Sequence, residues 1–158
     1  MRQRLIDAAG DHTGSVMVEI ALVLPVVLFL TLGLLQFGIL FYNYVLVTRA
    51  AELGARTLSI SRLDSSPYTH TQNAITAAAT NISGLTPTMS VSGSACSSDS
   101  GCQSALQAAY STATTTGSVQ PVSVTVSFSC NSNSILPADL FNLAGVCPLT
   151  VTMQAAVE

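Results

Sequence analysis

The four cysteines of this chain are the residues whose chemistry and spacing say most about its surroundings. Cys96, Cys102, Cys130 and Cys147 all lie behind a long apolar segment. This placement is typical of a domain that is exported to an oxidising compartment and held there by disulfides. Four cysteines allow three pairings, and the sequence leaves the choice open. The five residues between Cys96 and Cys102 do not match the usual spacing of zinc ligands, so disulfides are favoured over a zinc site.

Residue types that carry catalysis are few and far apart. The two histidines, His12 and His70, have no recognisable Ser or Cys partner, although a nucleophile needs such a base beside it. His70 is most simply a surface residue of a helix. Acidic residues behind the apolar segment are too scattered to suggest a carboxylate pair, and no Gly-rich phosphate loop is present. We therefore expect neither an enzyme nor a bound cofactor or metal.

The charge of the chain argues against one large class of partner. Its five basic residues are all arginine, and the net charge is -3. A surface of this kind cannot neutralise a run of phosphates, so nucleic-acid binding is not expected. At 49% hydrophobic and 8% charged residues, the composition is instead lopsided for a protein that faces water throughout.

The apolar residues gather in residues 20–42, where Thr31 and Gln36 are the main polar interruptions. About 20 apolar residues in a helix cross a hydrocarbon core of about 30 Å, so this segment can span a bilayer. It is too long for the apolar core of a secretory signal peptide. Pro25 is tolerated in a membrane helix as a kink, and it acts either as a harmless bend or as a hinge.

The helix is predicted to continue beyond the span through residues 43–60, because Gly54 is the only Gly or Pro there. Small residues recur four positions apart in this extension, as Ala50 with Gly54 and as Ala51 with Ala55. Such spacing lets helices approach closely, and it indicates packing between the helices of different subunits.

The cysteines, rather than the arginines, decide the orientation of the span. Two arginines precede it and three follow it, so the positive-inside rule leaves the direction open. Disulfides require the C-terminal part to lie outside the cytoplasm. A cytoplasmic N-terminus is therefore favoured.

A short sequence around residue 14 resembles the prepilin peptidase site of type IV pilins and pseudopilins. A charged leader precedes a Gly, the cut would fall between Gly14 and Ser15, and a Glu stands at mature position five, in the run Gly14-Ser15-Val16-Met17-Val18-Glu19. Ile20 departs from the usual pattern, which has an aromatic residue or Leu after the Glu. Three blocks from this point on are similar to the TadE-like family of the tight-adherence (Flp) pilus system: Val18-Glu19-Ile20-Ala21-Leu22-Val23-Leu24-Pro25, Gln36-Phe37-Gly38 and Ala50-Ala51-Glu52-Leu53-Gly54-Ala55-Arg56.

This resemblance implies a minor pseudopilin, of the TadE or the sibling TadF type, that is needed to assemble a type IV pilus and so for surface adherence and biofilm formation. Its implied partners are a prepilin peptidase, other pilins and pseudopilins, the pilus assembly platform and the lipid bilayer. The protein would cross the bacterial inner membrane once, with a cytoplasmic N-terminus and a periplasmic or extracellular C-terminal domain, or it would enter the pilus. The alternative is a single-pass anchored periplasmic protein that binds an envelope component and has no part in pili.

Glu19 gains a partner under this interpretation. By itself it is a carboxylate at the edge of the apolar run, which either faces headgroups and water or needs a neutralising partner. Cleavage would give Ser15 a positive amine at the membrane edge, and the Glu19 carboxylate of a neighbouring subunit is a natural partner for that amine. Such a pair would mainly set the register between subunits, because desolvation offsets much of the attraction.

The exported part is predicted to be an α+β domain in which a small antiparallel sheet lies on helices. Residues 66–83 have the apolar spacing of a helix. In residues 121–128, Val122, Val124, Val126 and Phe128 alternate strictly with Ser or Thr, which is the period of a half-buried strand, and residues 149–155 repeat the pattern. Residues 86–91 are a third candidate strand.

The cysteines fit this sheet. If the strands at residues 121–128 and 149–155 pair antiparallel, Cys130 and Cys147 lie at one end of the sheet and can be bridged. Cys96 and Cys102 would pin the Ser-rich turn between them.

The polar middle, residues 90–118, is expected to be a flexible and partly disordered loop with one or two helical turns at residues 105–110, because short polar side chains bury little apolar area. The chain is thus predicted to divide into a leader (1–14), a transmembrane and extended helix (15–62) and an exported domain (63–158).

Overall fold

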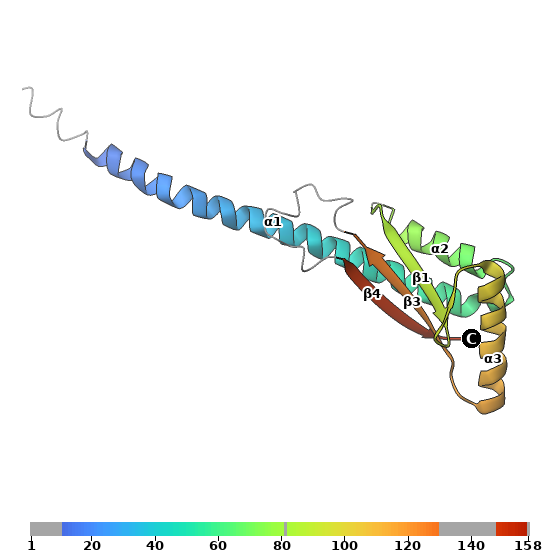
Figure 1. The fold of residues 1–158 in the computed structure, drawn as a ribbon. Helices are drawn as coiled ribbons and strands as arrows, with labels where there is room; N and C mark the ends of the chain where they lie inside the picture. The colour runs from blue at the N-terminus through green and yellow to red at the C-terminus, as the bar shows by residue number, and fades with distance from the viewer. Residues whose placement is uncertain (1–10, 81, 130–147, 158) are drawn as a thin grey trace, which may run out of the picture. The chain divides into compact units, whose positions relative to one another are not determined.

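The computed structural model of the chain describes residues 11–80, 82–129 and 148–157 (Figure 1). The chain divides into two compact units, Met1–Phe41 and Tyr42–Glu158. One helix, α1 (Asp11–Ile60), begins in the first unit and ends in the second. The predicted α+β architecture is confirmed: a long apolar helix is followed by a four-stranded antiparallel sheet and shorter helices.

The helix α1 is 50 residues long and contains Pro25 in its interior. Its threonines do not interrupt it, because their hydroxyls donate to carbonyls of the preceding turn: Thr48 Oγ1 to Tyr44 O and Thr57 Oγ1 to Leu53 O, both at 2.8 Å. At a rise of about 1.5 Å per residue the helix is about 75 Å long. Within the described residues it is the one helix that is long and apolar enough to cross a membrane.

The sheet of the second unit has the strand order β2-β1-β3-β4, and every neighbouring pair is antiparallel. The strands are β1 (Leu85–Val91), β2 (Ser94–Cys96), β3 (Pro121–Phe128) and β4 (Leu149–Ala156). A two-residue turn joins β1 to β2, and both its residues have a positive φ, 50° at Ser92 and 82° at Gly93. Turns of this kind match the twist of a hairpin. Ser92 is held in this conformation by its N–H, which donates to Pro121 O at 2.8 Å.

The two faces of the sheet differ sharply in chemistry. Val122, Val124, Val126 and Phe128 on β3 are fully or almost fully buried and form the centre of the core. The opposite face carries hydroxyl and amide side chains, which the strand register places side by side in rows: Thr86, Ser127 and Thr150; Thr88, Thr125 and Thr152; and Ser90, Ser123 and Gln154. Hydroxyls of neighbouring strands bond to each other, as in the 2.8 Å contact between Thr125 Oγ1 and Thr152 Oγ1.

The small residues of α1 pack inside this chain. Ala50, Ala51 and Ala55 are buried in the same core cluster as β3. At Gly54, a Cβ would lie 2.8 Å from Ile75 Cδ1 on α2 (Pro67–Ala78) and 3.2 Å from Val124 Cγ1 on β3. The prediction that these small residues of α1 pack between the helices of different subunits is therefore wrong. The spacing does serve close approach, but the partners are this chain's own helix and sheet.

The helix predicted for residues 66–83 is α2, which ends at Ala78, earlier than expected. Its N-terminus follows a short 3-10 helix, η2 (Ser61–Leu63). Inside α2 the buried Thr71 hydroxyl donates to Pro67 O at 2.7 Å, so this polar group is satisfied without solvent.

The flexible loop predicted for residues 90–118 is wrong. Residues 94–96 are β2, and the 18 residues of α3 (Asp99–Thr116) form a regular helix. Ser98 caps it by accepting the Gly101 N–H at 3.2 Å, and Gly117 ends it in the left-handed conformation, with φ 69°. A narrow stripe, Cys102, Leu106 and Ala109, is buried at helical spacing and gives the helix its attachment to the core.

Candidate functional site

The residues predicted to take part in processing and assembly all lie on α1. Gly14 and Ser15 follow closely after its first described residue, Asp11, and Glu19 lies one turn beyond Ser15. Residues four apart on a helix share a face. The structure therefore places Ser15 and Glu19 one turn apart on α1.

Gly14 has no structural reason to be glycine within the described chain. A Cβ at this position would have no atom within 4 Å, and the backbone φ is not one that favours glycine. A side chain would even stabilise the helix, by up to about 1 kcal/mol for Ala. The described structure therefore places no restriction on the side chain at this position.

Glu19 is exposed and has apolar neighbours. It borders a shallow hollow in the helix surface whose other lining residues are Ile20, Val23, Leu24 and Val27. Among the residues that the structure describes, the one ion pair joins Asp64 and His70, so Glu19 has no basic partner there. Pro25, six residues on, carries no N–H for the helical bond to the Ala21 carbonyl. One helical hydrogen bond is therefore missing near the start of the apolar part of α1.

The surface beyond Glu19 is unlike that of a water-soluble helix. No residue in the range 16–41 is buried, and the exposed side chains include Leu34 at 74% and Phe29 at 64% of their full accessible area. Contiguous apolar surface on this scale marks a membrane or protein contact. The arrangement suits a lipid or a helical neighbour around the first unit.

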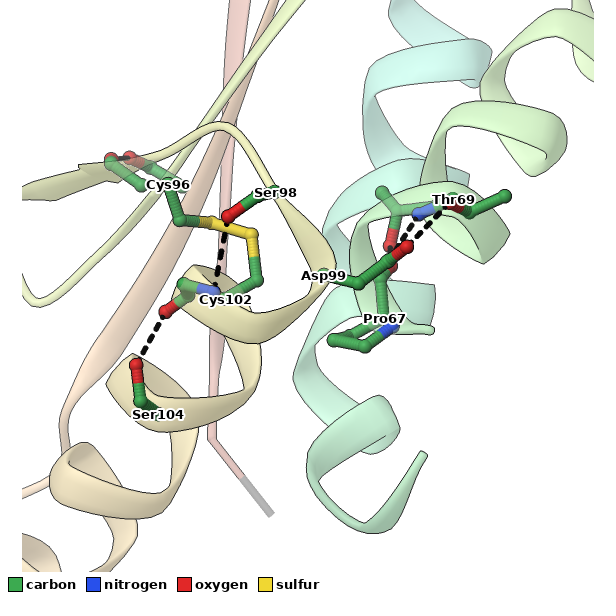
Figure 2. The surroundings of a disulfide bond; sticks show 11 residues. Pro67, Thr69, Cys96, Ser98, Asp99, Cys102 and Ser104 are labelled. Carbon is green, nitrogen blue, oxygen red and sulfur yellow. Dashed lines mark hydrogen bonds between the residues drawn. A yellow bond between two sulfur atoms is a disulfide. The ribbon is translucent and has the colours of Figure 1, made fainter. Parts of the chain in front are cut away.

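Of the four cysteines, Cys96 and Cys102 form a disulfide, with an S–S distance of 2.06 Å and a Cα–Cα distance of 5.0 Å. Figure 2 shows it linking the end of β2 to the first turn of α3, beside the Ser98 cap. Cys130 and Cys147 lie outside the described residues. The antiparallel pairing on which their predicted bridge depends is present, because Phe128 faces Leu149 in the β3–β4 register.

Next to the disulfide, Asp99 ties α3 to α2. Its Oδ1 accepts the Thr69 N–H at 2.8 Å, and its Oδ2 accepts the Thr69 hydroxyl at 2.7 Å (Figure 2). The Thr69 backbone N–H, and then the Thr69 hydroxyl, hold the pKa of Asp99 below its usual range. Asp99 lies in the first turn of its own helix and binds the first turn of another. One carboxylate therefore meets the positive ends of two helix dipoles.

His70 has a partner that the sequence did not reveal. Its Nδ1 contacts Asp64 Oδ2, while Asp64 Oδ1 accepts the Ser66 N–H at 3.2 Å. The His70 side chain is 57% exposed. In the described part of the chain, no group of three His, Cys, Asp or Glu side chains is placed to hold a metal ion. The pair and the Ser66 bond hold together the turn that leads into α2.

A second contact without a sequence signal joins η2 to α3. The Arg62 guanidinium lies over the Tyr110 ring, 3.5 Å from its centroid. Arg62 Nε is buried and forms no hydrogen bond with the described residues. The cation is instead stabilised by the ring face.

Comparison with known proteins identifies the helix segment. Residues 14–56 match the family model of TadE-like proteins, which confirms the resemblance and is consistent with a TadE-like protein of the Tad pilus system. No curated protein and no solved structure matches the chain. The matched segment begins at Gly14 and ends at Arg56, so it covers the apolar length of α1 and most of its extension into the second unit.

Proposed function

From the TadE-like character of residues 14–56, we propose that this protein is a minor pseudopilin that supports assembly of a tight-adherence (Flp) type IV pilus, and thereby surface adherence and biofilm formation. The observation that carries the proposal is the coincidence of this family segment with a helix that has no buried residue over residues 16–41 and then enters a folded domain. Its role is mechanical rather than catalytic, and it requires no cofactor.

Processing is the first step of the proposed role. A prepilin peptidase removes residues 1–14, and Ser15 becomes the N-terminus. The glycine at position 14 supports this step, because the described structure itself gives it no packing or conformational role. The protein is held in the inner membrane by residues 20–42 with the sheet domain outside the cytoplasm, where Cys96 and Cys102 can stay oxidised.

The second step of the proposed role is assembly, in which Glu19 pairs with a neighbouring subunit. Glu19 is exposed, lies among apolar side chains and has no basic partner in the described chain. The N-terminal amine of a neighbouring pilin or pseudopilin neutralises the Glu19 carboxylate. In a low dielectric the pair fixes register, and removal of one partner leaves an uncompensated charge.

The first experiment is N-terminal sequencing of the membrane-extracted protein from cells with and without an active prepilin peptidase. A start at Ser15 only with the active enzyme supports the proposal. An intact N-terminus in both strains would favour a simple anchored envelope protein instead. A deletion strain should also lose piliation and surface attachment.

Glu19→Gln separates processing from assembly. We expect the variant to be cleaved but to support less piliation, because the amide cannot neutralise the amine of a neighbour. Normal piliation by a normally cleaved Glu19→Gln protein would refute the proposed pairing. Thr13→Ala serves as a control for a neutral change near the cleavage site.

A further inference from the structure

Two polar side chains interrupt the apolar part of α1 in the first unit, and the structure treats them differently. The Thr31 hydroxyl donates to the Leu28 carbonyl at 2.9 Å, so it is satisfied by its own helix. The Gln36 amide oxygen is shielded from solvent and accepts no hydrogen bond from any part of the chain that the structure describes. Only Gln36 therefore needs a partner from elsewhere.

In a bilayer, a missing hydrogen-bond partner for the Gln36 amide costs more free energy than it does in water. The hydrocarbon core holds no water to bond an amide, and a polar side chain there finds a partner on another helix. An amide carries one acceptor and two donor hydrogens, so the group that satisfies it best presents both functions in return. Another amide at the same depth does so.

We propose that Gln36 pairs with the Gln36 of a second copy of this chain, in a parallel pair of membrane helices. Two copies inserted in the same direction bring the same residue to the same depth. Once each Gln36 side chain turns outward from the position in which its oxygen is shielded, the two amides can exchange reciprocal hydrogen bonds. The proposal rests on the membrane position of residues 20–42 in the proposed function, and it names a partner for that segment.

The surroundings of Gln36 allow a second helix to come close. Gly33 lies one turn before it and Leu40 one turn after it, so the three share a helix face. A Cβ at Gly33 would meet nothing within 4 Å, and the absence of a side chain there lets two backbones approach. Leu34 projects from a different face, which gives the expected interface a direction that can be tested.

The experiment measures association of the full-length protein in phosphatidylcholine vesicles, by energy transfer between two differently labelled populations. Gln36→Leu should lower the association constant roughly 3- to 20-fold, the range that membrane hydrogen bonds support. Gln36→Asn, which retains an amide, should keep part of the association. Thr31→Val is the matched control and should leave it unchanged, because the Thr31 hydroxyl is already bonded within its helix. Gln36→Leu makes the span more apolar, so a loss cannot be attributed to failed insertion.

Cross-linking tests the direction of the pair. Leu40→Cys should form an intermolecular disulfide in oxidised membranes far faster than Leu34→Cys. Equal rates, a monomeric wild-type protein, or a Gln36→Leu variant that associates like wild type would overturn the pairing. Extraction of the wild-type protein by alkaline carbonate would instead overturn the membrane position, and with it the proposed function, so the two failures are distinguishable.

Discussion

Substitution of Gly54 is the most direct test of how α1 packs in the second unit. In Gly54→Ala, the new Cβ would lie 2.8 Å from both Ile75 Cδ1 and Cγ1, and 3.2 Å from Val124 Cγ1. Carbon atoms in contact prefer about 3.5–4.0 Å, so the neighbours must move apart by roughly 0.7 Å. Ile75 and Val124 are both fully buried, which leaves little space for either side chain to yield.

The expected effect is the difference between two terms. Overpacking of a core by one methyl group costs about 1–3 kcal/mol. Ala is favoured over Gly inside a helix by about 1 kcal/mol, which offsets part of that. Gly54→Ala should therefore lower the free energy of unfolding by about 1 kcal/mol. Gly54→Val adds more volume and gains less helix preference, so it should lower the free energy of unfolding by about 3 kcal/mol.

A double-mutant cycle tests whether the loss of stability in Gly54→Ala comes from the contact with Ile75. Ile75→Ala alone removes a buried side chain and should cost about 2–5 kcal/mol. The same change opens the space that the methyl group added by Gly54→Ala would need, so the double variant should be about 1–2 kcal/mol more stable than additivity predicts. Urea unfolding of the full-length protein in micelles, followed by protease resistance of the sheet domain, gives all four free energies.

Gly38→Ala is the control for this cycle. It makes the same exchange in the same helix, with nothing within 4 Å of the added carbon. It should leave the stability of the sheet domain unchanged. Additive losses in the Gly54→Ala, Ile75→Ala protein would refute the close approach of α1 and α2 at this point.

Three further predictions concern the sheet domain. Replacement of Cys96 and Cys102 by Ser should lower its free energy of unfolding by roughly 2 kcal/mol, the chain-entropy value for so short a loop, and an unchanged urea midpoint would contradict this. Asp99 has a lowered pKa in the folded state, so its contribution is present above the unfolded pKa and is lost as the pH falls through the folded value. The urea midpoint of wild type should accordingly approach that of Asp99→Asn as the pH drops below about 4, whereas a constant difference would count against the Thr69 contact. Cys130 and Cys147 should appear as one disulfide-linked pair in non-reducing peptide mapping, and a free thiol at either position would disprove the bridge.

The sheet and the long helix were open to prediction because their signals are periodic or continuous. Val122, Val124 and Val126 alternate with hydroxyl residues, and the alternation assigns each side chain to a face before any partner strand is known. Residues 20–42 needed only their length and apolar character. In both cases the relevant physics is local in the sequence.

The helix α3 was missed because its buried stripe is narrow and made partly of small side chains. Cys102 and Ala109 do not stand out in a stretch rich in Ser, Thr and Ala, although the cap at Ser98 and the glycine at position 117 were visible in the sequence. Much of the attachment of α3 comes from outside its own segment, from the disulfide and from the bonds between Asp99 and Thr69. Those contacts depend on the three-dimensional fold.

The spacing of small residues in α1 was recognised, but the element that packs against these residues was predicted wrongly. Ala50 and Gly54 permit any close neighbour, and a spacing rule does not distinguish another subunit from the chain's own sheet. The candidate processing residues show the converse case. Gly14 has no packing neighbour and Glu19 no basic partner among the described residues, so the roles proposed for them depend on molecules outside this chain.

The course of α1 determines where this protein can be cut. The helix contributes Val47, Ala50, Ala51, Ala55 and Leu58 to the core that contains β3. A fragment that begins at residue 63 would lose those side chains and leave the apolar face of the sheet exposed to water. A soluble version must therefore retain about four turns of the helix that precede residue 60. The apolar length that can span a membrane and part of the folding unit share one helix, so trimming the protein at the end of that helix would unfold the sheet domain.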